Sequence, residues 1–136
     1  MEDSPPLRRL AFGVTLLTPV QTIQEGHEAL DGFLPDVKVS PDSSDFVYQI
    51  NRRRPSKVIG GLPLNRISKW TVQEVQDLVF SADGHVLRRP GKFACRVELD
   101  MNCVPSKQPL PKDRVADLFT ELVTLAAEVV SAGEVP

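Results

Sequence analysis

Long apolar runs and short catalytic motifs are both missing from this sequence of 136 residues. No uninterrupted apolar stretch approaches the roughly 20 residues that a membrane-spanning helix requires, so we expect no transmembrane segment and no membrane partner. The first six residues, Met1 to Pro6, are acidic and proline-rich and contain no apolar signal region. That N-terminus favours a cytoplasmic protein.

The chain also lacks the motifs that accompany nucleotide binding or acyl transfer, since it contains no GxGxxG, no GxxxxGK[ST] and no GxSxG. Its two histidines, His27 and His85, lie far apart in the sequence and do not have the ligand spacing of a zinc site. We therefore expect no catalytic residue, no metal and no cofactor, and an enzyme is the less favoured class.

Cysteine is scarce, with only Cys95 and Cys103, and both are expected on one extended strand. Eight residues of strand separate them by about 27 Å, far more than the roughly 7 Å between Cα atoms that a disulfide tolerates. We therefore expect two free thiols, with Cys95 acting as a small buried apolar residue.

What the sequence does contain is the composition of an ordinary globular protein, with 41% hydrophobic and 25% charged residues. A chain of this length is enough for one domain with its own core. We therefore expect residues 1–136 to form a single α+β domain in which residues 1–7 are a flexible N-terminal arm.

Two segments with clear periodicity organise the chain. From Lys92 to Asn102 apolar and mostly polar residues alternate, which predicts a strand with one apolar face. From Lys112 to Ala132 apolar residues recur at helical spacing, and Gly133 is suited to end this helix. Packing of the helix on the sheet predicts a core that contains Phe12, Val14, Phe93, Cys95, Val97, Leu99, Leu118, Leu122 and Leu125.

Alternation also predicts strands over residues 10–16, 46–54 and 64–70. A helix is expected to begin at Thr18, which can form a capping box with Gln21, and to end at Leu34-Pro35. Gly26 lies in the middle of this helix and weakens it by ~1 kcal/mol relative to alanine. The helix therefore needs support from the rest of the fold.

Residues 71–80 have two interpretations. Thr71 and Glu74 can cap a helix, which would give a ferredoxin-like β-α-β-β-α-β order plus a C-terminal helix. Alternatively, the segment continues a strand into a hairpin that turns at Asp83-Gly84. The hairpin would pair Phe80 with Leu87, Val72 with Cys95 and Trp70 with Val97, with a bulge at Pro90-Gly91. We favour the hairpin and predict a curved, mainly antiparallel sheet of about five strands, in the order β-α-β-β-β-β-α, packed against a long C-terminal helix.

Charge is spread unevenly along the chain. Residues 52–96 contain ten Lys/Arg against three Asp/Glu, whereas the whole chain has a net charge of −2. A basic segment binds phosphates, and Trp70 or Tyr48 can stack on a base, so a nucleic-acid-binding module is one alternative. The negative net charge weakens long-range attraction to nucleic acid. The candidate anion- or partner-binding residues are Arg52, Arg53, Arg54, Lys57, Arg66, Lys69, Arg88 and Arg89.

Glu98 and Asp100 lie ~7 Å apart on the polar face of the central strand, by strand geometry. Paired carboxylates can hold Mg²⁺ or act as acid and base, so a small metal-dependent enzyme is a second alternative. No nucleophile or base at a recognised spacing accompanies them, which makes a solvated pair neutralised by basic neighbours the favoured interpretation.

Three apolar residues, Val123, Ala127 and Val130, widen the stripe of the C-terminal helix beyond what packing on one sheet face needs. Large exposed apolar patches mark interfaces. We therefore predict a non-catalytic binding or accessory module that acts through protein–protein contact, with a homodimer or a stable protein partner at these residues.

Overall fold

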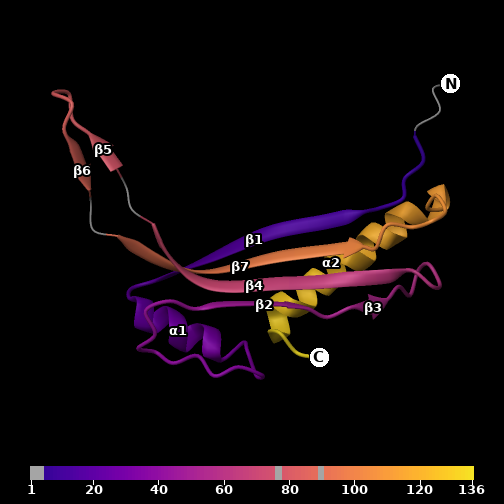
Figure 1. Ribbon diagram of the computed structural model, residues 1–136, viewed down its shortest axis with the longest axis horizontal. Coiled ribbons are helices and arrows are strands. Elements are labelled where there is room, and N and C mark those ends of the chain that lie inside the picture. Colours follow the sequence, from indigo (N-terminus) through magenta and orange to yellow (C-terminus); the bar gives the residue numbers. More distant parts are fainter. Residues whose placement is uncertain (1–4, 76–77, 89–90) are drawn as a thin grey trace. The chain divides into compact units, whose positions relative to one another are not determined.

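The computed structural model describes the backbone of residues 5–75, 78–88 and 91–136, and the side chains of these residues except 78, 87 and 88. It confirms the α+β class, with a five-stranded antiparallel sheet and a long C-terminal helix (Figure 1). The elements are β1 (Ala11–Val20), α1 (Ile23–Asp31), β2 (Val47–Asn51), β3 (Arg54–Pro55), β4 (Pro63–Val75), β5 (Leu78–Phe80), β6 (Val86–Arg88), β7 (Lys92–Cys103), the 3₁₀ turn η1 (Lys112–Arg114) and α2 (Val115–Ala132).

The main sheet has the strand order β1-β7-β4-β2, and the short strand β3 pairs with β4. Strands β5 and β6 form a separate two-stranded sheet. In this order β1 is at one end, so one side of β1 pairs with β7 and no other described strand pairs with its second side. Among the described strands, β1 is therefore an open edge of the sheet.

The described residues form two compact units. The first contains residues 5–15, 49–68 and 98–136, and the second contains residues 16–48 and 69–97. Strands β1, β4 and β7 each contribute residues to both units, as their bounds show.

In the first unit, α2 lies along the sheet (Figure 1). The helix packs there through a continuous stripe of buried residues. Five helix residues are buried, and the strands place Leu64, Leu99 and Met101 among the buried residues of the same unit. The helix ends as the sequence predicts, because Gly133 has a φ of 79° and its N–H donates to Val129 O. The buried helix residues are Leu118, Leu122, Leu125, Ala126 and Val129.

Of the nine residues predicted to form the core, five are buried and four are only half-buried. Cys95, Leu99 and the three predicted leucines of α2 are buried. Phe12 and Val14 are only half-buried, because they lie on the edge strand β1, where no further strand covers them. The other two half-buried residues are Phe93 and Val97.

In the second unit, α1 begins four residues later than predicted. Its N-cap is Thr22, whose Oγ1 accepts a hydrogen bond from Glu25 N at 3.1 Å. The Glu25 carboxylate accepts in turn from Gln21 N at 2.9 Å, which completes a capping box. A carboxylate in the first turn also complements the helix dipole, which the neutral Gln21 of the predicted box does not. Strand β1 consequently continues through Thr18 to Val20.

The segment 71–80 contains strand and not helix wherever the structure describes it, at 71–75 and 78–80. The predicted hairpin is therefore confirmed over the ferredoxin-like alternative, but its predicted turn is wrong. Phe80 pairs with Val86 and not with Leu87, so the loop has five residues, Ser81 to His85. A two-residue turn of type I′ needs positive φ at both central residues, and among the described residues only glycines, here Gly84, have positive φ.

Nearer the base of the hairpin, the β4–β7 pairing agrees with the predicted register. Val104 N donates to Pro63 O at 3.0 Å, and 63 with 104 belongs to the same register as the predicted Trp70–Val97 pair. The pairing at the tip and the pairing at the base therefore differ in register by one residue. Of the predicted bulge residues, Pro90 lies outside the described part of the chain.

Candidate interaction surface

The helix α2 has three faces with different chemistry. Its inner face is the buried stripe, and the remaining circumference divides into an acidic flank and an apolar flank. With about 100° of rotation per residue, Asp117, Glu121 and Glu128 lie roughly opposite Phe119 around the helix axis. The two flanks therefore face different neighbours.

The acidic flank faces β3 and the loop that follows it. Ser56 Oγ donates to one carboxylate oxygen of Glu121 at 2.6 Å, and Lys57 N donates to the other at 2.7 Å. Arg54 Nη1 lies 3.8 Å from the carboxylate of Glu128. A cavity of about 420 Å³ lies between these elements, and acidic and basic side chains line it together with Leu64 and other apolar groups. Its charges balance one another within the chain.

The apolar flank lies on the β1 side of α2. Phe119 meets Phe12 of β1 with ring centroids 5.8 Å apart and planes at 88°, an edge-to-face contact. Phe119 is nevertheless 41% exposed and Val130 is 46% exposed. Val123 is half-buried and Ala127 is exposed. The three residues predicted as an interface therefore lie on one flank, and none of them is buried within the chain.

The edge strand β1 carries no charged residue in its ten positions, AFGVTLLTPV. In the first unit, Phe12 and Val14 are half-buried, whereas Ala11, Gly13 and Thr15 are exposed. An edge strand has a row of unpaired N–H and C=O groups, and most proteins protect such an edge with charge, proline or a covering element. Within β1, the only residue of a protecting type is Pro19, near the end of the strand.

The open edge and the apolar flank are adjacent, because the Phe12–Phe119 contact joins them. Together they form what we call the β1–α2 surface, which consists of Phe12, Val14, Phe119, Val123, Ala127 and Val130. From sequence periodicity, only the last three of these residues were predicted to belong to an interface. Strand order was needed for the others, since periodicity does not tell an edge strand from a central one.

The basic segment contains a buried site that the sequence did not suggest. Arg66 and Glu134 are each only 1% exposed, and Arg66 Nη1 lies 3.1 Å from a carboxylate oxygen of Glu134. Arg52 Nε donates to the same oxygen at 3.0 Å, and Ser68 Oγ donates to the other oxygen at 2.5 Å. Arg66 also donates to Val135 O at 3.0 Å. Burial lowers the pKa of Arg66, and the nearby Glu134 carboxylate opposes that shift.

The other candidate basic residues are dispersed. Arg53 Nε donates to Asn65 Oδ1 at 2.9 Å, and Arg54 faces Glu128 across the cavity described above. Lys57 is exposed and Lys69 is half-buried, and they belong to different units. The side chain of Arg88 and the whole of Arg89 lie outside the described residues. Arg52, Arg54 and Arg66 pair with carboxylates of the same chain.

The carboxylates of the central strand are not assembled into a site. Asp100 is exposed and accepts a hydrogen bond from Asn102 Nδ2 at 2.9 Å, while Glu98 is half-buried. Within residues 5–75, 78–88 and 91–136, no group of three or more His, Cys, Asp or Glu side chains is placed to hold a metal ion. The same ranges contain no helix with the length and apolar character to cross a membrane.

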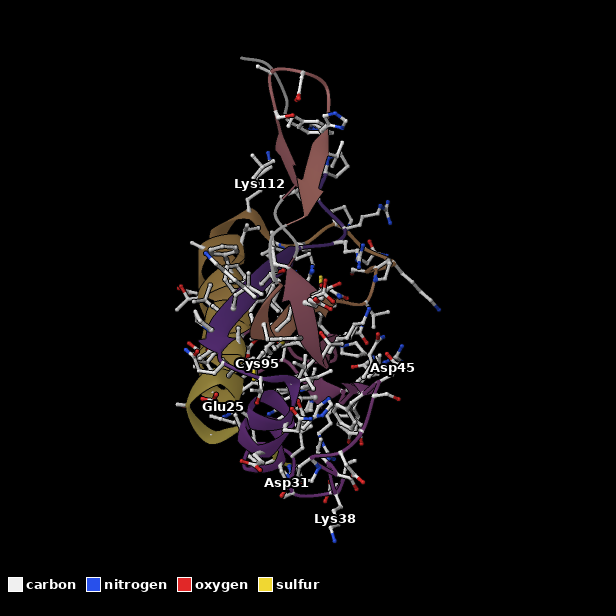
Figure 2. The ribbon with its side chains drawn as sticks, turned by 90° about the vertical axis from the view of Figure 1, so that its left-hand side faces the viewer. Glu25, Asp31, Lys38, Asp45, Cys95 and Lys112 are labelled. Carbon is white, nitrogen blue, oxygen red and sulfur yellow. The ribbon has the colours of Figure 1, made fainter. Side chains whose placement is uncertain are left out.

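Both cysteines are buried free thiols. Cys95 Sγ donates to Gly26 O at 3.4 Å, and Leu10 N donates to Cys103 Sγ at 3.1 Å. Burial raises the pKa of the Cys95 thiol, and the carboxylate of Glu25 raises it further. Both residues are labelled in Figure 2. His27 is 1% exposed and lies against Phe46 with ring centroids 6.1 Å apart.

Comparisons of the chain with protein-family models, with curated protein sequences and with solved structures find no significant match in any of the three.

Proposed function

We propose that this chain is a non-catalytic binding module that acts through protein–protein contact at the β1–α2 surface. The observation that carries the proposal is the adjacency of an uncharged open strand edge to an exposed apolar helix flank. Unpaired backbone groups give a partner strand its hydrogen bonds, and the apolar flank gives it buried area. The two features together favour a protein partner over a small ligand.

The proposal includes a cytoplasmic location. Cys95 and Cys103 are both unpaired and buried, so the fold depends on neither a disulfide nor an oxidised thiol. Cytosolic proteins keep their thiols reduced, whereas small secreted domains commonly depend on disulfides. The two free thiols in the core therefore support a location in a reducing compartment.

The nucleic-acid alternative has less support. Arg66 lies beneath the surface with Glu134, and Arg52 and Arg54 face carboxylates of the same chain. Guanidinium groups that are already paired with carboxylates neutralise fewer phosphates. They therefore release fewer counterions from nucleic acid and add less to its binding affinity. The enzyme alternative rests on Glu98 and Asp100, and the exposed Asp100 lacks the enclosed setting in which paired carboxylates act as acid and base.

Affinity capture from the source cell tests the proposal. Tagged wild-type chain is compared with a surface variant, Phe119→Glu with Val130→Glu, and a matched control, Thr120→Glu with Thr124→Glu. Both pairs add two carboxylates to exposed positions of α2, and Thr120 and Thr124 line the cavity beside Glu121 and Glu128. We expect captured proteins, untagged copies of the chain included, to be retained by the control and lost from the surface variant. Equal capture by all three would show that partners bind elsewhere.

A further inference from the structure

Resting on the proposed function, we propose that the partner at the β1–α2 surface is a second copy of this chain, joined by antiparallel pairing of the two β1 strands around Val14. The pairing would continue the sheet of one copy directly into the sheet of the other. Each copy would then close the open edge of its partner, and neither β1 would remain unpaired.

The chemistry of β1 makes a second copy a suitable occupant. The edge needs an extended segment without charge, because a charged strand would bring unpaired ionic groups against an apolar flank. β1 is itself such a segment, extended and uncharged over ten residues. In a dimer with a twofold axis, both copies contribute the same surface to the interface. A surface that is complementary to itself is therefore sufficient to form the dimer.

Side-chain alternation restricts the register. Val14 and Phe12 face the helix side of the sheet, where Phe12 contacts Phe119, and the exposed Ala11, Gly13 and Thr15 alternate with them. Directly opposed residues of an antiparallel pair have side chains on the same face. Two identical strands related by a twofold axis therefore pair only residues of the same parity, and one residue of β1 must oppose itself.

Pro19 limits the choice of that residue. Proline has no N–H to donate, and the axis at Val14 gives the longest ladder within β1 that leaves Pro19 out, from Ala11 to Leu17. Centring on Val14 keeps Pro19 from opposing any residue of this stretch, and it places Gly13 opposite Thr15 and Phe12 opposite Leu16. Centring on Thr15 would set Pro19 opposite Ala11. The axis at Val14 thus gives a ladder of uncharged pairs with none interrupted by proline.

The same axis positions the helices. A twofold axis perpendicular to the sheet leaves both α2 helices on the same face of the joined sheet. The apolar flank of α2 lies on the β1 side, as the Phe12–Phe119 contact shows. The flanks of the two copies therefore face each other across the axis. Phe119, Val123 and Val130 would be covered in the dimer, whereas the acidic flank would remain on the outside.

The mass of the purified chain in solution is the first test. Sedimentation at micromolar concentration should give twice the 15.0 kDa of one chain. Gly13→Lys with Thr15→Lys places lysine opposite lysine across the axis and should give a folded monomer. The matched control, Thr120→Lys with Thr124→Lys, adds the same charge to the acidic flank and should remain dimeric. Mixing the lysine pair with Gly13→Glu, Thr15→Glu should restore dimers, now as heterodimers.

Cysteine cross-linking tests the register. Opposed residues of an antiparallel pair have Cα atoms about 4.5–5.5 Å apart, within the range that a disulfide accepts. Val14→Cys should form a covalent dimer on mild oxidation, and Thr124→Cys should not. Cys95 and Cys103 are buried and do not compete.

A wild-type monomer, or a dimer that the lysine pair leaves intact, would overturn the second copy as partner. So would a dimer in which Val14→Cys does not cross-link. These outcomes leave the proposed function open to its own test, because affinity capture still shows whether a different protein needs the β1–α2 surface. If capture is independent of that surface, the proposed function fails whatever the mass of the purified chain.

Discussion

At the residue scale, three side chains converge on the buried carboxylate of Glu134. It receives two guanidinium groups and a hydroxyl, although it lies beyond the last turn of α2. A buried charge without a partner is strongly unfavourable, so this constellation holds the C-terminal end of α2 to β4.

Glu134→Gln should destabilise the chain by about 3–5 kcal/mol, since it leaves Arg66 buried without its counter-charge. The same change at Glu128, whose pair with Arg54 is exposed, should cost about 0–1 kcal/mol. Urea unfolding of the two variants measures both values. Equal losses would contradict the account, and Arg66→Met combined with Glu134→Leu should recover part of the Glu134→Gln loss.

The Cys95 thiol gives the structure a pH dependence of definite sign. Its pKa is raised by burial and by Glu25, so the folded chain holds this proton more tightly than the unfolded chain does. The resulting stabilisation is complete below the unfolded thiol pKa of about 8.5 and is lost as the pH rises through the folded value. Cys95→Ala should flatten the decline in unfolding free energy above about pH 8.5. An unchanged alkaline decline would contradict the shift.

Single residues were only partly predictable from the sequence. The burial of His27 and of Cys95 follows from periodicity, since both lie on apolar faces of their elements. Arg66 occurs in a polar-looking stretch, and its burial depends on Glu134, 68 residues later in the chain. A partner so distant in sequence leaves no local pattern.

At the element scale, α1 shows that intrinsic propensity yields to packing. Gly26 weakens the helix in isolation, yet a Cβ at this position would lie 2.8 Å and 2.9 Å from the two methyl groups of Val72. The close approach of α1 to β4 therefore requires glycine. Because Val72 is β-branched, rotating its side chain does not relieve both contacts.

Gly26→Ala should destabilise the chain by roughly 1–3 kcal/mol, opposite in sign to the gain expected from helix propensity. Val72→Ala in the same chain should recover much of that loss, because it removes both opposing methyl groups. Thermal or urea unfolding of the two single variants and the double variant measures the coupling. Additive effects would show that the two residues do not meet.

The two elements with the strongest periodicity were predictable, whereas the start of α1 and the tip of the hairpin were not. Strand β7 and helix α2 lie within a few residues of their predicted bounds. The start of α1 was misplaced because two capping boxes overlap along the sequence, and only the one with a charged carboxylate forms. The hairpin tip was misplaced because Asp83 does not take the positive φ that a two-residue turn demands.

At the scale of the whole molecule, the charge distribution separates the candidate functions. We expect only weak nucleic-acid binding at physiological salt, because Arg52, Arg54 and Arg66 are paired with carboxylates of the chain. Replacing Arg52, Arg53 and Arg54 with alanine should leave this weak binding nearly unchanged. Three lost phosphate contacts would instead lower the log–log salt slope by roughly 2–3. Fluorescence titration of a short DNA or RNA at several salt concentrations distinguishes the two outcomes.

The β1–α2 surface is tested most directly by a photo-crosslinking side chain placed on one flank of α2 at a time. Phe119→benzoylphenylalanine puts the probe on the apolar flank, and the same replacement at Thr124 puts it on the acidic flank. Irradiation in the source cell should yield protein cross-links from position 119 and few from position 124, whether the partner is a second copy or another protein. Cross-links from position 124 alone, or none from either position, would contradict the assignment of this surface.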